Sequence, residues 1–322
     1  MPSEPVSRET ATTSPAQAAT AGRFAAPVDL TRFAWLSIAA ALTTMAIKGL
    51  AAWLTGSVGL LSDAAESVVN LVAAIVALFA LRVAIQPPDA GHPYGHSKAE
   101  YFSAAVEGIM IFVAAAVIIE QAINRLFHPM MPEKLGIGLS ICIGASLING
   151  VVSFVLLRAG RAHRSPTLIA DSRHLMTDVI TSAAVLLGVG LVAIFHQPRL
   201  DPIVALLAGV NILWTGFGLI RGSVNNLMDA SLPDSELALI QSVLDEIRSQ
   251  GVLEFHAIRS RLAGNRRFVS MHVLVPDDWT VTKGHNACED VAEALMAKDP
   301  GLRVETHLEP KGDPRSYEDQ DI

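Results

Sequence analysis

The chain has 322 residues, of which 51% are hydrophobic and only 17% are charged, against about 25% charged in an ordinary soluble domain. Together with a mean hydropathy of +0.41, this composition excludes a wholly soluble globular protein. Residues 1–228 hold 14 Lys/Arg and 13 Asp/Glu, whereas residues 229–322 hold 10 and 18. We therefore predict a membrane part followed by an acidic soluble domain, which would repel nucleic acid and attract cations.

The first 28 residues are rich in Ala, Thr, Ser and Pro and contain no apolar core, so they do not form a secretory signal peptide. We predict a disordered cytoplasmic tail over residues 1–28. A transit peptide is the alternative, and Glu4 and Glu9 argue against it. With only two cysteines, Cys142 and Cys288, a disulfide framework is not expected.

Six windows are long and apolar enough to cross a bilayer, whose core of about 30 Å needs about 20 residues of helix. They run over about 33–54, 57–84, 99–125, 135–158, 166–195 and 201–221. We therefore predict an α-helical membrane protein with a six-helix transmembrane domain over residues 29–228.

The positive charges between the spans predict the orientation, because Lys and Arg predominate in short cytoplasmic loops. The N-terminal flank, the second and fourth loops and the exit from the sixth span hold eight of them, and the remaining loops hold three. Both termini, and with them the soluble domain, are expected in the cytoplasm. A bacterial plasma membrane is the expected location, with an organellar membrane as the alternative.

Two of the six spans carry charge deep in their interior. These residues are Asp63, Glu66 and Asn70 in LLSDAAESVVN of the second span, and Asp171, His174 and Asp178 in LIADSRHLMTD of the fifth. The spacing is three and then four residues in both, which keeps each set on one helical face. The two segments align as a repeat, 108 residues apart.

Both polar stripes are expected at the same depth. The second and fifth spans run antiparallel, and each has a predicted N-cap nine residues before a central residue. Ser57 precedes Glu66, and Ser165, with Pro166 after it, precedes His174. Nine residues rise about 13–14 Å, close to half the hydrocarbon thickness, so the stripes should meet near the midplane, as in many transporters.

The chemistry of the stripes favours a cation site over side chains that merely stabilise one another, because an intramembrane carboxylate costs at least about 2.5 kcal/mol. Imidazole and carboxylate together suit Zn²⁺, Fe²⁺ or Co²⁺. The candidate ligands are Glu66, Asn70, His174 and Asp178, with Asp63 and Asp171 in support. Because the same groups bind protons, metal and proton would compete, which is a physical basis for antiport.

With these features the sequence resembles the cation diffusion facilitator family over about residues 30–310. The resemblance rests on the six spans, the HLMTD segment, the loop DAGHPYGHSKAE and a histidine-bearing C-terminal domain. It implies a dimeric exporter of divalent metals that exchanges them for protons. His174 and Asp178 match the family's fifth-span pair. Glu66 and Asn70 stand where the family has Asp or His followed by Asp, so the site has one formal charge fewer.

The loop between the second and third spans is a second candidate site. Asp89, His92 and His96 are spaced to surround one ion across a Pro/Gly turn, although two loop histidines are often only solvated. The resemblance implies a metal site at these positions. It also implies that Lys98 pairs with Asp229 in a salt bridge that stabilises a dimer.

The soluble domain over residues 229–310 is predicted as helix–strand–strand–helix–strand. The helices run over about 234–249 and 281–298, and the strands over about 253–262, 267–275 and 302–309. Asp234 or Ser235 is the expected cap of the first helix, and FVSMHVLV alternates as a half-buried strand does. This order resembles the ferredoxin-like α+β domain that the family uses for metal sensing and dimerisation. Residues 311–322 are expected to form an acidic tail.

Five residues of this domain are potential metal ligands: His256, His272, His285, His307 and Glu309. His307 and Glu309 are two apart on a predicted strand and so share a face, and imidazole with carboxylate fits zinc. The resemblance implies that all five bind a pair of ions. Cys288 is expected to pack rather than to bind metal.

The predicted function is therefore export of a divalent cation by a homodimer in the lipid bilayer, with Zn²⁺ or Fe²⁺ foremost and Co²⁺ or Mn²⁺ next. Zn²⁺ is also the expected regulator. The sequence has no phosphate-binding glycine loop and no nucleophile arrangement, so neither ATP drive nor an enzyme is expected. Two alternatives stay open: a membrane metal sensor or scaffold that does not transport, and a membrane metallohydrolase with an open coordination position.

Overall fold

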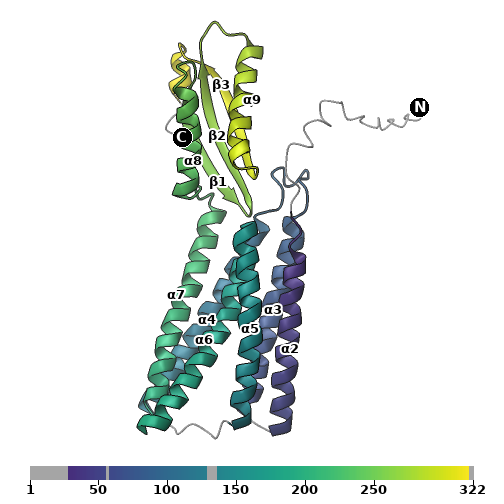
Figure 1. Cartoon of the computed structure of the whole chain (residues 1–322), viewed down its shortest axis with the longest axis vertical. Helices are drawn as coiled ribbons and strands as arrows, with labels where there is room; N and C mark the ends of the chain where they lie inside the picture. The colour runs from purple at the N-terminus through teal and green to yellow at the C-terminus, as the bar shows by residue number, and fades with distance from the viewer. Residues whose placement is uncertain (1–27, 56–57, 129–135, 319–322) are drawn as a thin grey trace, which may run out of the picture.

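The computed structural model describes residues 28–55, 58–128 and 136–318, arranged as a long helical bundle with a smaller α+β domain at one end (Figure 1). The bundle helices are α2 (Thr31–Thr55), α3 (Val58–Ala84), α4 (Ala99–Phe127), α5 (Gly136–His163), α6 (Pro166–Phe195) and α7 (Leu200–Leu227). Each contains a stretch long and apolar enough to cross a membrane. The six predicted spans are confirmed, and the chain is an integral, multi-pass membrane protein.

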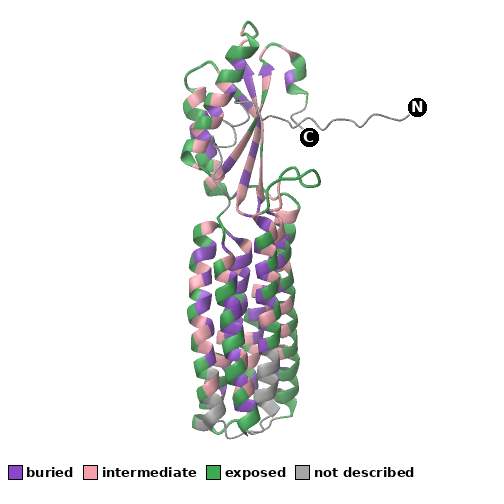
Figure 2. Ribbon diagram, turned by 90° about the vertical axis from the view of Figure 1, so that its right-hand side faces the viewer, coloured by how far each residue is buried: buried purple, intermediate pink, exposed green. Residues whose placement is uncertain are grey.

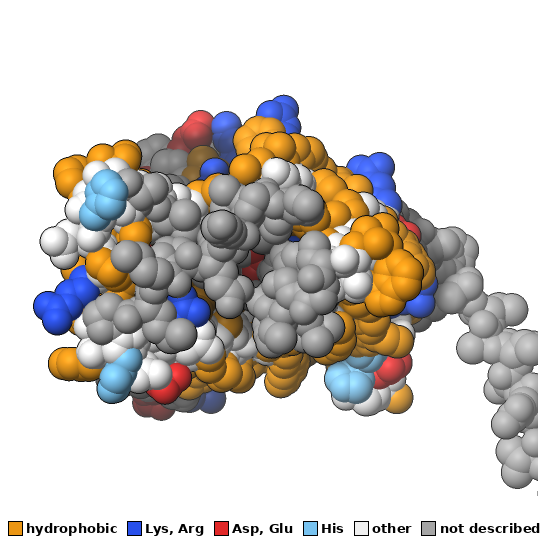
Figure 3. Space-filling model, turned by 90° about the horizontal axis from the view of Figure 1, so that it is seen from below, with side chains coloured by type: hydrophobic (Ala, Val, Ile, Leu, Met, Phe, Trp, Pro, Cys, Tyr) orange, Lys and Arg blue, Asp and Glu red, His pale blue; other side chains and the backbone are white. Residues whose placement is uncertain are grey.

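The outside of the bundle is apolar, as lipid contact requires. Trp53, Phe79, Phe154, Leu207 and Trp214 are each more than 60% exposed, whereas buried residues concentrate between the helices (Figure 2). Seen from the end away from the soluble domain, hydrophobic side chains make up most of the described surface (Figure 3). Exposed apolar surface of this extent is typical of a membrane-facing or interaction surface.

The six helices pair as two halves of a repeat. In contact are α2 with α5, α3 with α6, and α4 with α7, so each helix of the first half touches its counterpart in the second. The backbones of α4 and α7 approach closely: a Cβ on Gly216 would lie 2.8 Å from the backbone nitrogen of Phe112. Small residues allow such approach between membrane helices.

The start of α6 follows the predicted chemistry. Ser165 is its N-cap, with its side chain accepting from the backbone N–H of Leu168, and Pro166 occupies the first turn, where its missing N–H costs nothing. This cap is confirmed. The matching prediction for Ser57 lies outside the described residues.

The soluble domain has the predicted order, with α8 (Asp234–Arg248), β1 (Glu254–Ala263), β2 (Arg266–Val275), α9 (Val281–Lys298) and β3 (Leu302–Pro310). The sheet order is β1-β2-β3, with β1 antiparallel and β3 parallel to β2. Two details differ from expectation. The N-cap of α8 is Pro233, with no side-chain cap, because the chain enters the helix directly from this proline. Within the expected tail, Pro314–Tyr317 form a 3₁₀ turn, η1.

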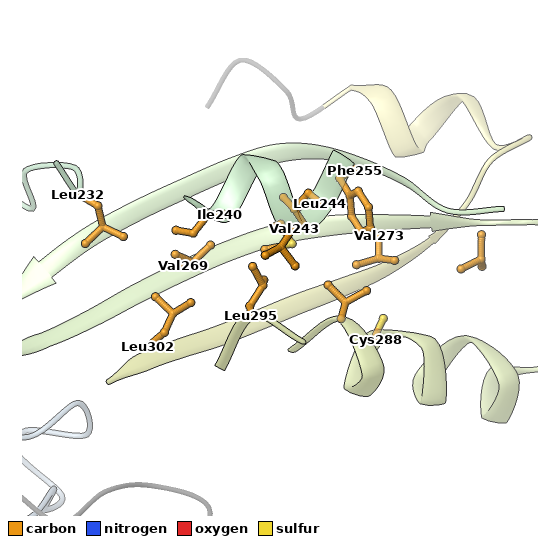
Figure 4. Packing of buried hydrophobic residues seen from close by; sticks show 13 residues of the cluster. Leu232, Ile240, Val243, Leu244, Phe255, Val269, Val273, Cys288, Leu295 and Leu302 are labelled. Atoms are coloured by element: carbon orange, nitrogen blue, oxygen red, sulfur yellow. The ribbon is translucent and has the colours of Figure 1, made fainter. Parts of the chain in front are cut away.

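Both helices cover one face of the sheet and leave the other open. The core between them joins Leu244 of α8, Met271 and Val273 of β2, and Val291 and Leu295 of α9, as Figure 4 shows for most of the cluster. Cys288 packs in the same cluster, and burial raises the pKa of its thiol. The prediction that this cysteine packs is therefore confirmed. The residues that alternate with the core positions of β2 and β3 project from the open face.

The soluble domain docks on the adjacent ends of the helices through the β1–β2 turn. Gly264 has φ +61, and a Cβ there would lie 2.4 Å from the carbonyl oxygen of Ser97, so only glycine fits. Its own carbonyl accepts from the hydroxyl of Tyr101 at 3.4 Å. The domain is thereby placed directly against the loop between α3 and α4.

An ion-pair cluster reinforces this junction. The guanidinium of Arg267, whose side chain is only 5% exposed, forms a salt bridge with Glu236 and lies 3.5 Å from Asp299. Arg164, in the link between α5 and α6, reaches the same two carboxylates at 3.7 and 3.3 Å. Arg164 of the transmembrane domain and Arg267 of the soluble domain thus pair with the same two carboxylates.

Candidate metal centres

The first candidate site lies between α3 and α6. Asn70 of α3 faces His174 and Asp178 of α6, and all three are less than 10% exposed. Asn70 bridges the pair: its Oδ1 lies 2.9 Å from Nε2 of His174, and its Nδ2 donates to Oδ2 of Asp178. Three of the four predicted ligands therefore meet. Glu66, and Asp63 beside it, lie on α3 with side chains outside the described part of the structure.

Asn149 of α5 belongs to the same cluster, and sequence reasoning missed it. Its Nδ2 donates to Oδ2 of Asp178 at 3.0 Å, and the side chain is 2% exposed. Ser153, one turn further along α5, exchanges hydrogen bonds with Ser172 of α6, which fixes the register of the two helices. In the sequence, Asn149 stands out only as an amide in an otherwise apolar span. Its spacing within α5 does not indicate that it contacts α6.

The hydrogen bonds define which atoms are ready for a cation. A carbonyl oxygen only accepts, so Nε2 of His174 carries the hydrogen in its bond to Oδ1 of Asn70. Nδ1 of His174 and Oδ1 of Asn149 are buried and have no hydrogen-bond partner among the described residues. Buried polar atoms left in this way call for an explanation, and a positively charged ligand supplies one.

A second polar layer lies on the side of this cluster nearer the soluble domain. Asp171 accepts from the hydroxyl of Ser37 at 3.0 Å. Glu107 of α4, fully buried, lies 3.4 Å from the hydroxyl of Ser103. One oxygen of each carboxylate has no hydrogen-bond partner within the described ranges. Asp171 thus supports the site from one turn away rather than joining the Asn70 cluster.

The expectation that only the second and fifth spans carry deep charge was wrong. Glu107 of α4 is 0% exposed and Lys48 of α2 is 6% exposed. Glu100, at the start of α4, is also buried and accepts from the hydroxyl of Ser165. Each was visible in the sequence as a charge within an apolar window. They escaped notice because, unlike the two stripes, none belongs to a repeated pattern.

The loop between α3 and α4 forms the second candidate site. Nδ1 of His92 lies 3.3 Å from Asp89, and Nε2 of His96 lies 3.5 Å from its other oxygen. The donor atoms of all three lie within 4.8 Å of one another. The backbone N–H of His92 donates to Asp89 and holds the pKa of that carboxyl below its usual range, so Asp89 is ionised at neutral pH and suited to a cation.

The third candidate site lies on the open face of the soluble sheet. His256, His272 and His307 are in register across β1, β2 and β3, so the three rings form one row. Oε2 of Glu309 lies 2.8 Å from Nε2 of His256 and 3.2 Å from Nδ1 of His272. His307 is exposed, with Nε2 3.5 Å from Oε1 of Glu309. The predicted shared face of His307 and Glu309 is confirmed.

His285 does not join this row. It is exposed on α9, the helix that covers the other face of the sheet. The helix is seated there by Gly284, where a Cβ would lie 2.6 Å from the side chain of Leu308, and by the buried Cys288. Within one copy of the chain, the ligand set of the sheet is therefore His256, His272 and Glu309, with His307 at its edge.

Lys98 and Asp229 form the expected pair, at 2.8 Å between Nζ and Oδ1. Arg261 approaches the same carboxylate at 3.5 Å. The hydrogen bond from Lys98 lowers the pKa of Asp229. Within the chain the pair ties the start of α4 to the end of α7. Its contribution to a dimer stays a prediction.

Comparison with known proteins agrees with this organisation. Residues 34–228 match the cation efflux transmembrane domain family, and residues 232–311 match the family described as cation efflux protein, cytoplasmic domain. An uncharacterised transporter of Synechocystis, sll1263, is 49% identical over 289 residues, covering 90% of this chain and 93% of the relative. The cation-efflux pump FieF of Salmonella arizonae is 30% identical over 282 residues, covering 87% and 93%.

A solved structure of CzrB in its zinc form, described as a proposed zinc transporter, is 35% identical. It covers 26% of this chain and 93% of its own, with a TM-score of 0.25, at which a likeness carries no argument about the fold. The transmembrane family matches more than half of the chain, and its two relatives are matched along nearly their whole lengths. The chain therefore belongs to the cation efflux family, also called the cation diffusion facilitators.

Proposed function

We propose that this protein exports divalent metal cations, Zn²⁺ or Fe²⁺ foremost, through the site at Asn70, His174 and Asp178. The observation that carries the proposal is the convergence of an imidazole, a carboxylate and two amides from three membrane helices. Imidazole nitrogen with carboxylate and carbonyl oxygen is a donor set for first-row divalent metals. Glu66, one turn before Asn70 on α3, is the proposed fourth ligand.

Exchange for protons follows from the same atoms. Nδ1 of His174, buried without a hydrogen-bond partner among the described residues, is the imidazole atom that would bind the metal, and Asn70 would turn its amide nitrogen away from Asp178. Protonation of His174 or Asp178 in turn removes a donor from the metal. Metal and proton therefore compete for one site, so a pH gradient can drive the metal uphill.

Asn70 distinguishes this site from the family pattern. As an amide it offers only its carbonyl oxygen to a metal and contributes no charge. With Glu66 and Asp178 as the carboxylates, the site offers two negative charges, which balance a divalent ion. We propose that this neutral position adjusts the preference among Zn²⁺, Fe²⁺, Co²⁺ and Mn²⁺.

The soluble domain is proposed to sense metal and to hold a homodimer. Its row of histidines with Glu309 would bind Zn²⁺, since the donors fit that ion. The loop of Asp89, His92 and His96 adjoins the β1–β2 turn, because Arg266 donates to the carbonyl oxygen of Tyr94 in that loop at 3.2 Å. A metal at the loop site would therefore stiffen the junction between the soluble domain and the transmembrane helices.

Metal flux in proteoliposomes tests the proposal against the alternatives. Purified protein should move metal into vesicles across a pH gradient, and Asp178→Ala should abolish movement while the protein remains folded and dimeric. If the intact protein binds metal but moves none, a sensor or scaffold is the better description. Hydrolytic turnover without flux would favour a membrane metallohydrolase.

A further inference from the structure

A groove runs along the outside of the bundle between α6 and α7. It consists of a cavity of about 440 Å³ at the cytoplasmic end and another of about 450 Å³ further along the helices, both lined by Arg173 and Gly218. Gly218 and Gly222 of α7 keep the groove open, because a Cβ at either position would meet nothing within 4 Å. The two cavities therefore adjoin along α6 and α7, and the first also borders α4 and the soluble domain, through Tyr101, Glu236 and Arg267.

The cytoplasmic end of the groove carries net positive charge. Its charged lining consists of Arg161, Arg164, Arg173, Arg267 and Glu236. Arg164 and Arg267 form ion pairs with Glu236 and Asp299. Arg161 and Arg173 are exposed and form no ion pair with any residue that the structure describes. Two positive charges thus remain for a ligand with negative charge.

Arg173 places a positive charge inside a membrane-spanning helix. It lies seven residues after the start of α6, about 10 Å into the helix, and an arginine facing hydrocarbon is costly. Side chains of a helix tilt toward its N-terminus, which for α6 is the cytoplasmic end. The guanidinium can therefore extend toward the headgroup level, where Arg161 lines the same cavity. A phosphate between the two would satisfy both.

The other end of the groove is suited to an acyl chain. Its lining includes Met176 and Ile180 of α6 and Ile212 and Trp214 of α7. From Trp214 to Asn226, which lines the cytoplasmic end, α7 rises about 18 Å. This length is close to the hydrocarbon thickness of one leaflet, about half of 30 Å.

We propose that the groove between α6 and α7 binds an anionic phospholipid of the cytoplasmic leaflet. Arg161 and Arg173 hold its phosphate, and one acyl chain lies along the apolar end. Basic pockets between membrane helices on the cytoplasmic side bind anionic headgroups in this way. None of the candidate metal ligands that the structure describes lines this groove. The lipid proposal can therefore be tested independently of the proposed transport.

Quenching of Trp214 by brominated lipid tests the proposal directly. Full-length protein with Trp35, Trp53 and Trp279 replaced by Phe is reconstituted in vesicles of phosphatidylcholine and phosphatidylglycerol, with one of the two lipids brominated on an acyl chain. Brominated phosphatidylglycerol should quench Trp214 more strongly than brominated phosphatidylcholine does. Arg173→Gln should lower this preference about fivefold. Arg221→Gln is the control, because Arg221 is exposed on α7 but lines neither cavity.

A second pair of variants tests the groove without changing charge. Gly218→Leu should fill the groove and reduce the preference, whereas Gly49→Leu on α2, also in open space, should leave it unchanged. Equal quenching by both lipids in the unsubstituted protein would overturn the proposal, since it indicates bulk lipid. Protection of Trp214 from both lipids would overturn it too, because a second copy of the chain then covers this face.

Discussion

Asn149→Ala removes an amide that no spacing rule predicts, from the centre of the proposed transport site. Its Nδ2 donates to Asp178 at 3.0 Å, and a hydrogen bond to a charged group contributes about 1.5–3 kcal/mol. Partners that orient a metal ligand typically change metal affinity by about 10- to 100-fold, which corresponds to about 1.4–2.7 kcal/mol. The two figures agree, so we expect a 10- to 100-fold weaker transport site.

Stability should respond less than affinity does. Oδ1 of Asn149 is buried without a hydrogen-bond partner in the described part of the chain, and such an atom destabilises the fold by about 1–3 kcal/mol. Replacement by alanine removes this unsatisfied oxygen together with the useful hydrogen bond. The two effects offset each other, so the midpoint of thermal denaturation should change little while metal affinity falls.

Binding isotherms for Zn²⁺ and Co²⁺ on detergent-solubilised, full-length protein measure the effect. The background carries His92→Ala and His272→Ala, so that only the membrane site is titrated. Asn211→Ala is the matched control, because Asn211 is an exposed amide on α7. The reasoning is refuted if Asn149→Ala binds within twofold of its parent, or if the control weakens binding equally.

Three further outcomes are expected. Arg267→Ala should destabilise the full-length protein by up to about 3 kcal/mol in denaturation experiments, because Glu236 loses its buried partner; an unchanged midpoint would contradict this. In a background that carries His92→Ala and Asp178→Ala, His272→Ala should remove most of the stabilisation by Zn²⁺, which is about 2.7 kcal/mol at 100 times the Kd; a retained zinc-dependent shift would exclude the sheet site. Lys98 lowers the pKa of Asp229. The ion pair therefore stabilises the fold fully above the unfolded pKa of Asp229, about 3.9, and this stabilisation is lost as pH falls through the folded pKa. Asp229→Asn should therefore lower stability at pH 7 by less than about 1 kcal/mol and have no effect at the acid limit; an equal effect at both would refute the pairing.

The spans, the soluble-domain order and most of the metal-binding groups were predictable because they depend on local pattern. Apolar length alone identifies a membrane helix, and alternation alone identifies β2. The spacing of His174 and Asp178 likewise specifies one face of α6. Glu107 was within reach of the same reasoning, as a carboxylate in the middle of an apolar window.

Residues joined only by packing between distant elements were not predictable. Asn149 reaches Asp178 because Ser153 and Ser172 set the register of α5 and α6, which no single span encodes. His285 shares its residue type with the histidines of the sheet, yet α9 packs on the opposite face and keeps it apart. Residue type and spacing thus indicate candidate ligands, and tertiary packing decides which of them meet.

The most direct test of the account is metal flux into proteoliposomes that contain the full-length protein, measured with Zn²⁺, Fe²⁺, Co²⁺ and Mn²⁺ under a pH gradient and repeated with Asn70→Asp. The account predicts flux that stops when the pH gradient is dissipated and that Asp178→Ala abolishes. In Asn70→Asp, where the site gains a negative charge, the order of preference among the four metals should change. Metal binding without flux in the intact protein would contradict the central claim. An unchanged preference in Asn70→Asp would remove Asn70 from the selectivity of the site.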